Sequence, residues 1–261
     1  MKIAVVTDSG TGWTQAQAEA LGIHYLPLQV KCGDDEFLDG IDITVSQLYA
    51  RLKQGDMPTT SMPPVGRVEG LFERLKQEQV EHVIAVPLSA GISSTSEMIQ
   101  AAARRAELPL TVIDPYTTVN TQGYLALSAL KLAERGVEPA EIERRLKECV
   151  DHSNTLLVPD DLQHLKRGGR LTPLAAALGS MLKIKPLLQL NKQTEGRVDV
   201  LDKVRTMSRA LSRMADVAKS DGFDPEAYEM TVLDSEAEEG ALQMIALLEE
   251  AFPGIQIHRS A

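Results

Sequence analysis

A run of apolar residues at 82–88 is followed directly by a turn rich in serine and glycine, and then by a helical pattern that begins near Thr95. This order constrains the fold strongly, because a buried strand that leads through a short turn into a helix is the repeating unit of parallel α/β proteins. The first backbone N–H groups of such a helix are free, and the helix dipole is positive at that end. The turn at 88–96 therefore predicts a site for a phosphate, sulfate or carboxylate group.

The same turn contains no His, Lys, Asp or Glu. A serine hydroxyl without an adjacent base is a weak nucleophile, so the segment is predicted to hold a ligand rather than to cleave one. The residues at 91–94 also do not form the G-x-S-x-G sequence of a nucleophile elbow. A second hydroxyl-rich segment, at 59–64, precedes this unit and is a further candidate for contact with a ligand.

The first 153 residues alternate between strand and helix patterns. Thr44 and Gln47 have the spacing of a capping box at the start of one of the helices. Alternating units of this kind predict an α/β fold in which helices cover both faces of a parallel sheet. Strands are predicted at 2–7, 23–30, 82–88 and 110–114, and helices at 14–21, 44–54, 65–79, 95–106, 118–135 and 139–150.

The pattern changes after residue 150. Two predicted strands, at 183–190 and 197–202, are joined by a polar turn through Gly196, as in a hairpin. A hairpin among βα units predicts a second α/β domain with a mixed sheet, so we divide the chain into a domain at 1–153, which carries the two hydroxyl-rich segments, and a domain at 154–261. The other strands of the second domain are predicted at 155–158, 228–233 and 255–258, and its helices at 160–166, 206–219 and 236–251.

Composition argues against several classes of partner. The formal net charge of −10 and the aromatic content of 4% argue against nucleic acid, which is bound through Lys and Arg and through stacked rings. No apolar stretch approaches the ~20 residues that cross a bilayer, and we expect no signal peptide before the first strand. Cys32 and Cys149 are predicted to be reduced thiols in a cytoplasmic protein. The five histidines are scattered, so no metal site is expected.

Three other segments leave alternatives open. Residues 7–12 follow the first strand and suggest a dinucleotide site, but they lack the third glycine of the G-x-G-x-x-G fingerprint, and a tight turn beside a cleft is favoured. Asp39 and Asp42 could hold a metal, although a turn is favoured there as well. The basic stretches 166–170 and 203–206 are consistent with charges at an ordinary helix end or with docking of a partner or a phosphate.

Short motifs occur in order along nearly the whole chain. They read T-D-S at 7–9, D-G-I-D-I at 39–43, T-T-S-M-P-P at 59–64, S-A-G-I-S-S-T at 89–95, V-I-D-P at 112–115, L-Q-H-L-K-R-G-G-R at 162–170, L-K-I-K-P at 182–186 and K-V-R-T at 203–206. In this order the set closely resembles the DegV family, the bacterial fatty-acid-binding proteins whose characterised members act as the FakB subunit of fatty acid kinase.

The resemblance implies two α/β domains and a buried long-chain fatty acid, such as palmitate, as the bound ligand, with no other cofactor. It also implies that hydroxyl groups of two motifs hold the fatty-acid carboxylate, and these hydroxyls fall on Thr60 and Ser93. Asp8 and Ser9 are expected to line the cleft. The residues assigned a secondary place in this site are Ser61, Ser94, Thr95, Asp8 and Ser9.

Members of the family present the carboxylate to a separate kinase that uses ATP and forms an acyl-phosphate. The resemblance therefore implies a carrier that is not itself an enzyme, with a fatty acid kinase as its protein partner. The basic residues that we consider for docking of this partner are Arg167, Arg170, Lys203 and Arg205.

Departures from the family pattern modify these expectations. Met62 and Pro64 replace polar residues, and Ser94 replaces a glycine, whose backbone torsions serine resists. Family proteins continue into an H-x-G-P-G segment that assists the carboxylate, and we find no counterpart to it before the sequence ends at 258–261. The alternatives to a carrier are an enzyme acting on a phosphorylated or nucleotide substrate and a degenerate paralogue that binds no ligand.

Overall fold

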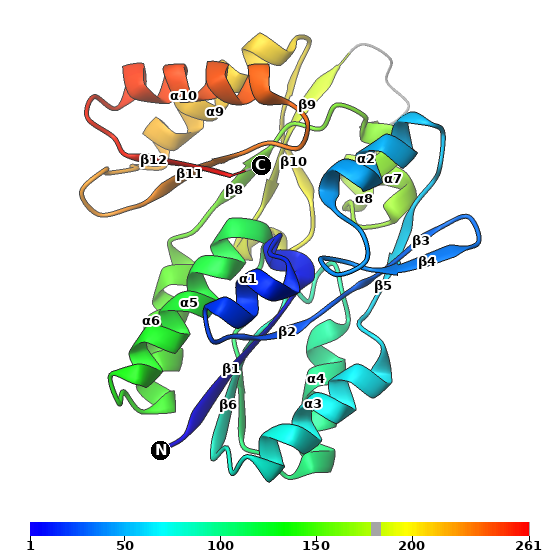
Figure 1. Cartoon of the computed structure of the whole chain (residues 1–261). Helices are drawn as coiled ribbons and strands as arrows, with labels where there is room; N and C mark the ends of the chain where they lie inside the picture. The colour runs from blue at the N-terminus through cyan, green and yellow to red at the C-terminus, as the bar shows by residue number, and fades with distance from the viewer. Residues whose placement is uncertain (179–183, 261) are drawn as a thin grey trace. The chain divides into compact units, whose positions relative to one another are not determined.

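The computed structural model describes residues 1–178 and 184–260 (Figure 1). The chain divides into two compact units. Unit 1 is Met1–Asn154 together with Leu190–Arg197, and unit 2 is Thr155–Gln189 together with Val198–Ala261. None of the helices in the described part of the chain has both the length and the apolar character needed to cross a membrane.

Unit 1 is built on a parallel sheet of four strands. The strand order is β2-β1-β6-β7, and each neighbouring pair runs parallel. Sequential strands that run parallel need helical crossovers, which is why helices separate most of them in the sequence. The strands are β1 (Ile3–Asp8), β2 (His24–Leu26), β6 (His82–Val86) and β7 (Leu110–Val112).

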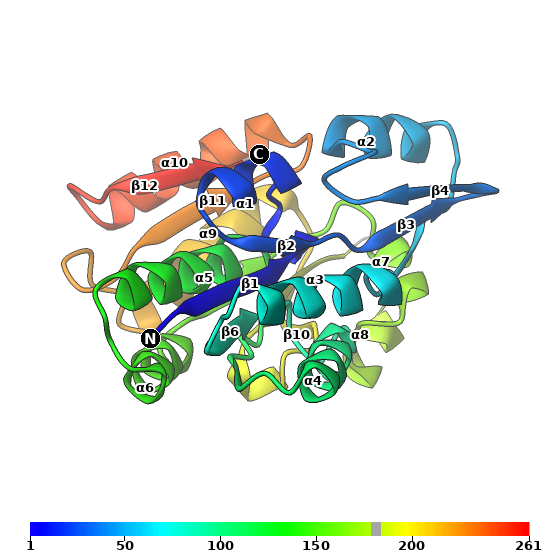
Figure 2. The same ribbon diagram turned by 60° about the horizontal axis from the view of Figure 1, so that its bottom comes forward.

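Helices cover both faces of this sheet, as the sequence predicts. Ala4 and Val6 of β1 pack on one face with α3 (Val65–Gln77) and α4 (Thr95–Ala106). Val5 points to the other face and packs with α5 (Val119–Glu134) and α6 (Pro139–Asp151). Figure 2 shows the two helix pairs on opposite sides of β1 and β6. The alternation follows from the period of two along a strand.

The prediction of one strand at 23–30 is wrong. The segment forms β2 and then β3 (Gln29–Cys32), which belongs to a separate antiparallel sheet of order β4-β3-β5. Pro27 lies between them, and proline has no N–H to donate to a sheet. The other strands of that sheet were not anticipated; they are β4 (Asp35–Leu38) and β5 (Thr59–Ser61).

The helices of unit 1 begin close to the predicted residues. α1 (Gln15–Ala20) and α2 (Val45–Lys53) both start with capping boxes, and the box at Thr44 and Gln47 is the predicted one. α3 buries four apolar residues along one face, whereas Val65 in its first turn is 55% exposed; the buried residues are Val68, Leu71, Phe72 and Leu75.

Unit 2 is also α/β. Its three-stranded sheet has the order β10-β9-β8, and the antiparallel pairing of β9 with β10 confirms the predicted hairpin. The predicted start of that hairpin at Lys183, like Leu182 of the L-K-I-K-P motif, lies outside the described residues. The elements of this sheet and the helices before it are β8 (Thr155–Leu157), α7 (Leu162–Gly168), α8 (Pro173–Leu178), β9 (Lys185–Leu190) and β10 (Asp199–Val204).

The rest of unit 2 is a small layer of two helices on a parallel strand pair. Leu211, Val232 and Met244 form part of the apolar core between them. The elements are α9 (Met207–Ser220), β11 (Met230–Leu233), α10 (Glu238–Ala251) and β12 (Ile257–Ser260).

Candidate ligand-binding site

Asp8, the last residue of β1, is the centre of a buried hydrogen-bond network in unit 1. Its Oδ1 accepts from the Gly10 N–H and from Gln122 Nε2, each at 2.9 Å, and its Oδ2 accepts from the Leu88 N–H at 2.9 Å. The residue has no exposed surface. Asp8 therefore ties the turn after β1, the turn after β6 and helix α5 to one another.

Burial raises the pKa of Asp8 to about 6, while the hydrogen bonds from Gln122, Leu88 and Gly10 act in the opposite direction. Desolvation disfavours the charged carboxylate, and N–H donors favour it. With its oxygens engaged by neighbours and no exposed surface, Asp8 holds the loops in position and does not itself offer an atom to a ligand.

Ser9 joins the parallel sheet to the antiparallel sheet. Its Oγ accepts from the Leu28 N–H at 3.0 Å, and Leu28 directly precedes β3. The Ser9 hydroxyl also bonds the carboxyl group of Asp39, whose pKa is nevertheless raised by burial. Through these contacts the strand β3, and with it β5, is fixed at the end of β1 where Asp8 lies.

The turn at 88–96 leads from β6 into α4 as predicted. Ser93 is half-buried, and its Oγ lies 2.9 Å from Thr95 Oγ1 and accepts from the Thr95 N–H at 3.3 Å. Thr95 itself is buried, whereas Ser94 is exposed. Of the predicted secondary residues, Thr95 is thus brought together with Ser93 and supports its hydroxyl.

Ser94 is the N-cap residue of α4, and its backbone does not require glycine. Its φ is −87°, in the range that all L-residues adopt, so the replacement of the family glycine introduces no strain at this position. The Ser94 side chain makes no cap hydrogen bond. The start of α4 therefore retains backbone donors and the positive end of the helix dipole for an anionic group.

A second turn closes against this loop from later in the chain. Ser89 Oγ donates to the Gly196 carbonyl at 3.1 Å, and a Cβ on Gly91 would overlap the backbone of Glu195 and Gly196. Gly196 has a φ of +67°, which glycine adopts without strain. The close approach explains why small residues occupy both turns and why Leu190–Arg197 belongs to unit 1.

Thr60 lies on the exposed strand β5, paired with Val30 of β3. Successive side chains of a strand point to opposite faces, so Thr60 faces the side of Val30 and Ser61 faces the other side. Ser61 Oγ is 3.2 Å from Gln29 Nε2, whereas the Thr60 hydroxyl has no hydrogen-bond partner among the described residues. The Thr60 hydroxyl is therefore free both to donate and to accept, whereas the Ser61 hydroxyl already accepts one hydrogen bond and keeps its proton to donate.

The four basic residues proposed for docking are all exposed in unit 2. The carbonyl of Arg170 accepts from the Val198 N–H at 3.3 Å, just before β10 begins, whereas Lys203 lies near the far end of that strand. Five residues of strand separate these positions by about 16 Å. Gly169, with a φ of +73°, ends α7 as an ordinary C-cap.

Gln122 and Thr118, two further members of the network, were not predicted from the sequence. Thr118 Oγ1 donates to the Gly10 carbonyl at 2.7 Å, and the Gln122 amide also donates to the carbonyl of Val86 at 3.1 Å. Gln122 lies four and seven residues before Ala126 and Ala129, which are fully buried. A polar residue in phase with the buried face of a helix was the available sign that this amide has an internal partner.

The chain is similar to known proteins over nearly its whole length. A family model described as "Uncharacterised protein, DegV family" matches residues 2–261. Protein DegV of Bacillus subtilis (strain 168) is 32% identical over 263 residues, which cover 100% of this chain and 92% of the relative.

Two solved structures match over the same extent. One is a fatty acid binding DegV family protein from Streptococcus agalactiae, with a TM-score of 0.88 and 29% identity over 99% of this chain and 92% of the other. The second is DegV, a fatty acid binding protein from Bacillus subtilis, with a TM-score of 0.85 and 31% identity over 100% of this chain and 92% of the other. With a family model that spans nearly its whole length and a relative 32% identical throughout, this chain belongs to the DegV family.

Proposed function

We propose that the protein binds a long-chain fatty acid and presents its carboxylate to a separate kinase. The observation that carries this proposal is the free, exposed hydroxyl of Thr60 in a chain similar over its whole length to proteins described as fatty acid binding. Ser93, at the start of α4, supplies the second hydroxyl. A carboxylate between these donors would replace solvent with charge-assisted hydrogen bonds.

Binding energy would come mainly from the acyl chain. About fourteen buried methylenes at ~0.8 kcal/mol each contribute on the order of 10 kcal/mol before the costs of ordering the ligand. The headgroup contacts then serve mostly to fix the orientation of the carboxylate. This division predicts that removing one hydroxyl weakens binding without abolishing it.

The chemistry of the turn at 88–96 supports a carrier role, because the turn offers hydroxyl and backbone donors but no general base. Transfer of a phosphoryl group would therefore depend on a partner kinase that acts in the cytoplasm. Arg167, Arg170, Lys203 and Arg205 are exposed cations through which unit 2 could bind that partner. Free thiols at Cys32 and Cys149 are compatible with a reducing compartment.

Displacement of a fluorescent fatty acid tests the headgroup assignment. Thr60→Val and Ser93→Ala should each weaken binding by about tenfold, the usual effect of losing a hydrogen bond to a charged group. Thr59→Val is the matched control, because Thr59 is exposed on the same strand but faces the opposite side. Equal affinities in Thr59→Val and Thr60→Val would contradict the role of Thr60.

The ligand itself is tested by native mass spectrometry with lipid extraction of the purified protein. An added mass that matches a fatty acid supports the carrier. An apo mass that persists after incubation with fatty acids favours the degenerate paralogue. A melting temperature raised by ATP or NAD favours the enzyme, because a ligand that binds only the native state stabilises it. Hydroxylamine trapping of acyl-phosphate, with a fatty acid kinase and ATP present, tests presentation to the partner.

A further inference from the structure

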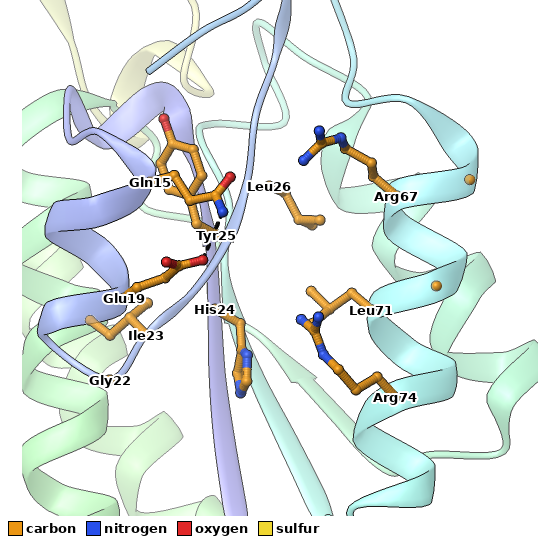
Figure 3. A pocket seen from close by; sticks show the side chains of 12 residues that line it. Gln15, Glu19, Gly22, Ile23, His24, Tyr25, Leu26, Arg67, Leu71 and Arg74 are labelled. Atoms are coloured by element: carbon orange, nitrogen blue, oxygen red, sulfur yellow. Dashed lines mark hydrogen bonds between the residues drawn. The ribbon is translucent and has the colours of Figure 1, made fainter. Parts of the chain in front are cut away.

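A groove of about 520 Å³ lies in unit 1 between α1 and α3, over strand β2 (Figure 3). It is distinct from the hydroxyl-bearing turns described above. β2 is an edge strand that pairs with β1 on one side, and no strand of the described chain pairs with its other side. An unpaired strand edge exposes backbone N–H and carbonyl groups that can pair with another extended segment.

The α3 side of the groove carries two glycines, and their lack of side chains widens the groove. A Cβ placed on Gly66 or on Gly70 would find no other atom within 4 Å, so neither glycine is required by packing within the chain. Glycine weakens a helix relative to alanine. Its presence at two positions four residues apart leaves open space beside β2, with Leu26 and Leu71 as an apolar floor.

Two arginines of α3 point into this groove (Figure 3). Arg67 forms no ion pair with any residue in the ranges that the structure describes, and Arg74 forms a long ion pair with Glu78, at 3.9 Å. The Cα atoms of the two arginines are separated by seven residues of helix, about 10 Å, which suits an elongated anionic partner better than a single small anion.

The wall opposite the two arginines carries a carboxylate, that of Glu19 on α1. Glu19 on the opposite wall accepts from Gln15 Nε2 at 2.7 Å. Burial and the charge of Arg74 lower the pKa of His24, which therefore stays neutral in this environment. The α3 side of the groove is thus positive, and Glu19 makes the α1 side negative, so an anionic ligand would bind along α3.

We propose that this groove binds an extended acidic peptide segment of a partner protein, which adds to β2 as a further strand and places its carboxylates against Arg67 and Arg74. Every second side chain of the added strand faces α3, since α3 covers that face of the sheet. Carboxylates two to four residues apart in such a strand are about 7–13 Å from one another, which matches the spacing of the two arginines.

A fluorescein-labelled heptapeptide of alternating glutamate and valine is a suitable probe, with binding followed by anisotropy. Gly70→Leu fills the groove with a residue that also favours the helix, so binding should be lost while the fold is retained. Arg67→Gln combined with Arg74→Gln should weaken binding by about tenfold. Arg135→Gln is the matched control. It removes an exposed charge that lies outside the groove, and it should leave the affinity unchanged.

Two further measurements separate strand addition from simple charge attraction. Amide hydrogen exchange at residues 24–26 should slow when the peptide is bound, and it should not slow in Gly70→Leu. A peptide with proline at every second position, which lacks half of the backbone donors, should bind at least about tenfold more weakly. Fatty-acid displacement by the same variants should be unaltered, which keeps this proposal independent of the proposed function.

Several outcomes would overturn the proposal. A peptide of alternating lysine and valine that binds equally well would exclude recognition of acidic side chains. Equal binding of the proline peptide, or unchanged exchange at 24–26, would exclude strand addition. Inorganic phosphate that displaces the peptide at low concentration would identify a small-anion site instead.

Discussion

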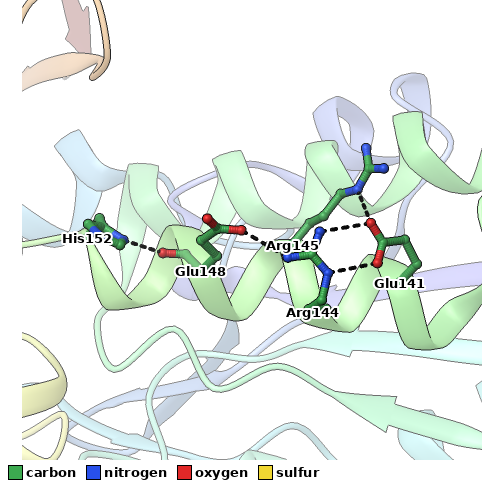
Figure 4. A network of polar contacts seen from close by, with 5 residues as sticks. All are labelled: Glu141, Arg144, Arg145, Glu148 and His152. Carbon is green, nitrogen blue, oxygen red and sulfur yellow. Dashed lines mark hydrogen bonds and ion pairs between the residues drawn. The ribbon is translucent and has the colours of Figure 1, made fainter.

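Asp8 and Glu141 are two carboxylates of unit 1 that each bind several donors, one of them buried and the other at the surface. Asp8 accepts from two backbone N–H groups and one amide. Glu141 accepts from the guanidinium groups of Arg144 and Arg145 at 2.7–2.9 Å on the outer side of α6 (Figure 4). Burial raises the pKa of Asp8 to about 6, whereas the two arginines lower the pKa of Glu141 to about 2.

The opposite shifts show which physical effect dominates at each position. Desolvation exceeds hydrogen bonding at Asp8, and charge-assisted hydrogen bonding exceeds desolvation at Glu141. The partners differ as well. Asp8 connects residues more than one hundred positions apart, up to Gln122, while Glu141 connects only the next turn of its own helix. We therefore expect Asp8 to support the tertiary structure of the loops and Glu141 to have a local effect.

Removing the buried carboxylate should have the largest consequence. Asp8→Ala leaves the Gly10 and Leu88 N–H groups without their acceptor and leaves the amide of Gln122 with one partner fewer. We expect the free energy of unfolding to fall by about 3 kcal/mol, the range for breaking a buried polar network. Urea unfolding of the wild type and the variant measures this loss. A loss below about 0.5 kcal/mol, the usual size of a surface effect, would contradict the role of Asp8.

The pH dependence of stability should show an effect of about the same size. The pKa of Asp8 is about 6 in the folded protein, above its ordinary value of 3.8. The folded state therefore holds the proton more tightly, and this contribution to stability is complete below about pH 4 and lost as the pH rises through 6. A shift of this size corresponds to about 3 kcal/mol.

Asp8→Asn provides the reference for that measurement, because it keeps the shape of the side chain but cannot ionise. Urea unfolding of both proteins between pH 4 and pH 7 cancels the titration of the other acidic groups. The stability of the wild type relative to the variant should decrease as the pH rises. A difference that stays constant would show that the hydrogen bonds to Asp8 balance its desolvation, and one that increases with pH would show that they outweigh it; either result would contradict the prediction.

Local patterns in the sequence predicted most of the fold, and tertiary pairing accounts for what was missed. The capping box at Thr44 depends on two residues only three positions apart, so it was visible in the sequence. β5 is a strand of three exposed residues that exists because it pairs with β3, about thirty positions away. Its hydroxyl side chains carry no hydrophobic alternation that could have marked it as a strand.

In the candidate site, too, local features were predicted and tertiary contacts were not. The free hydroxyl of Thr60 and the position of Ser93 before α4 agree with a donor role that the motifs suggested, and this role stays a prediction. Both carboxylate oxygens of Asp8 accept hydrogen bonds from within the chain. This could not be predicted, since the donors come from three separate segments. The packing of Gly196 against Ser89 depends on a turn more than one hundred residues later in the chain.

Glu141→Gln should have the smallest effect and completes the comparison. It removes the charge that Arg144 and Arg145 share, but these side chains are largely exposed and solvent screens their interaction. Because the pKa of Glu141 is depressed, its contribution is present above the ordinary carboxyl range and is lost only as the pH falls toward 2. Thermal unfolding at pH 7 should show a small decrease in Tm at low salt, and this decrease should disappear near 1 M NaCl. A loss of stability as large as that of Asp8→Ala, or one that salt does not reduce, would mean that the outer side of α6 has a structural role that its exposure does not suggest.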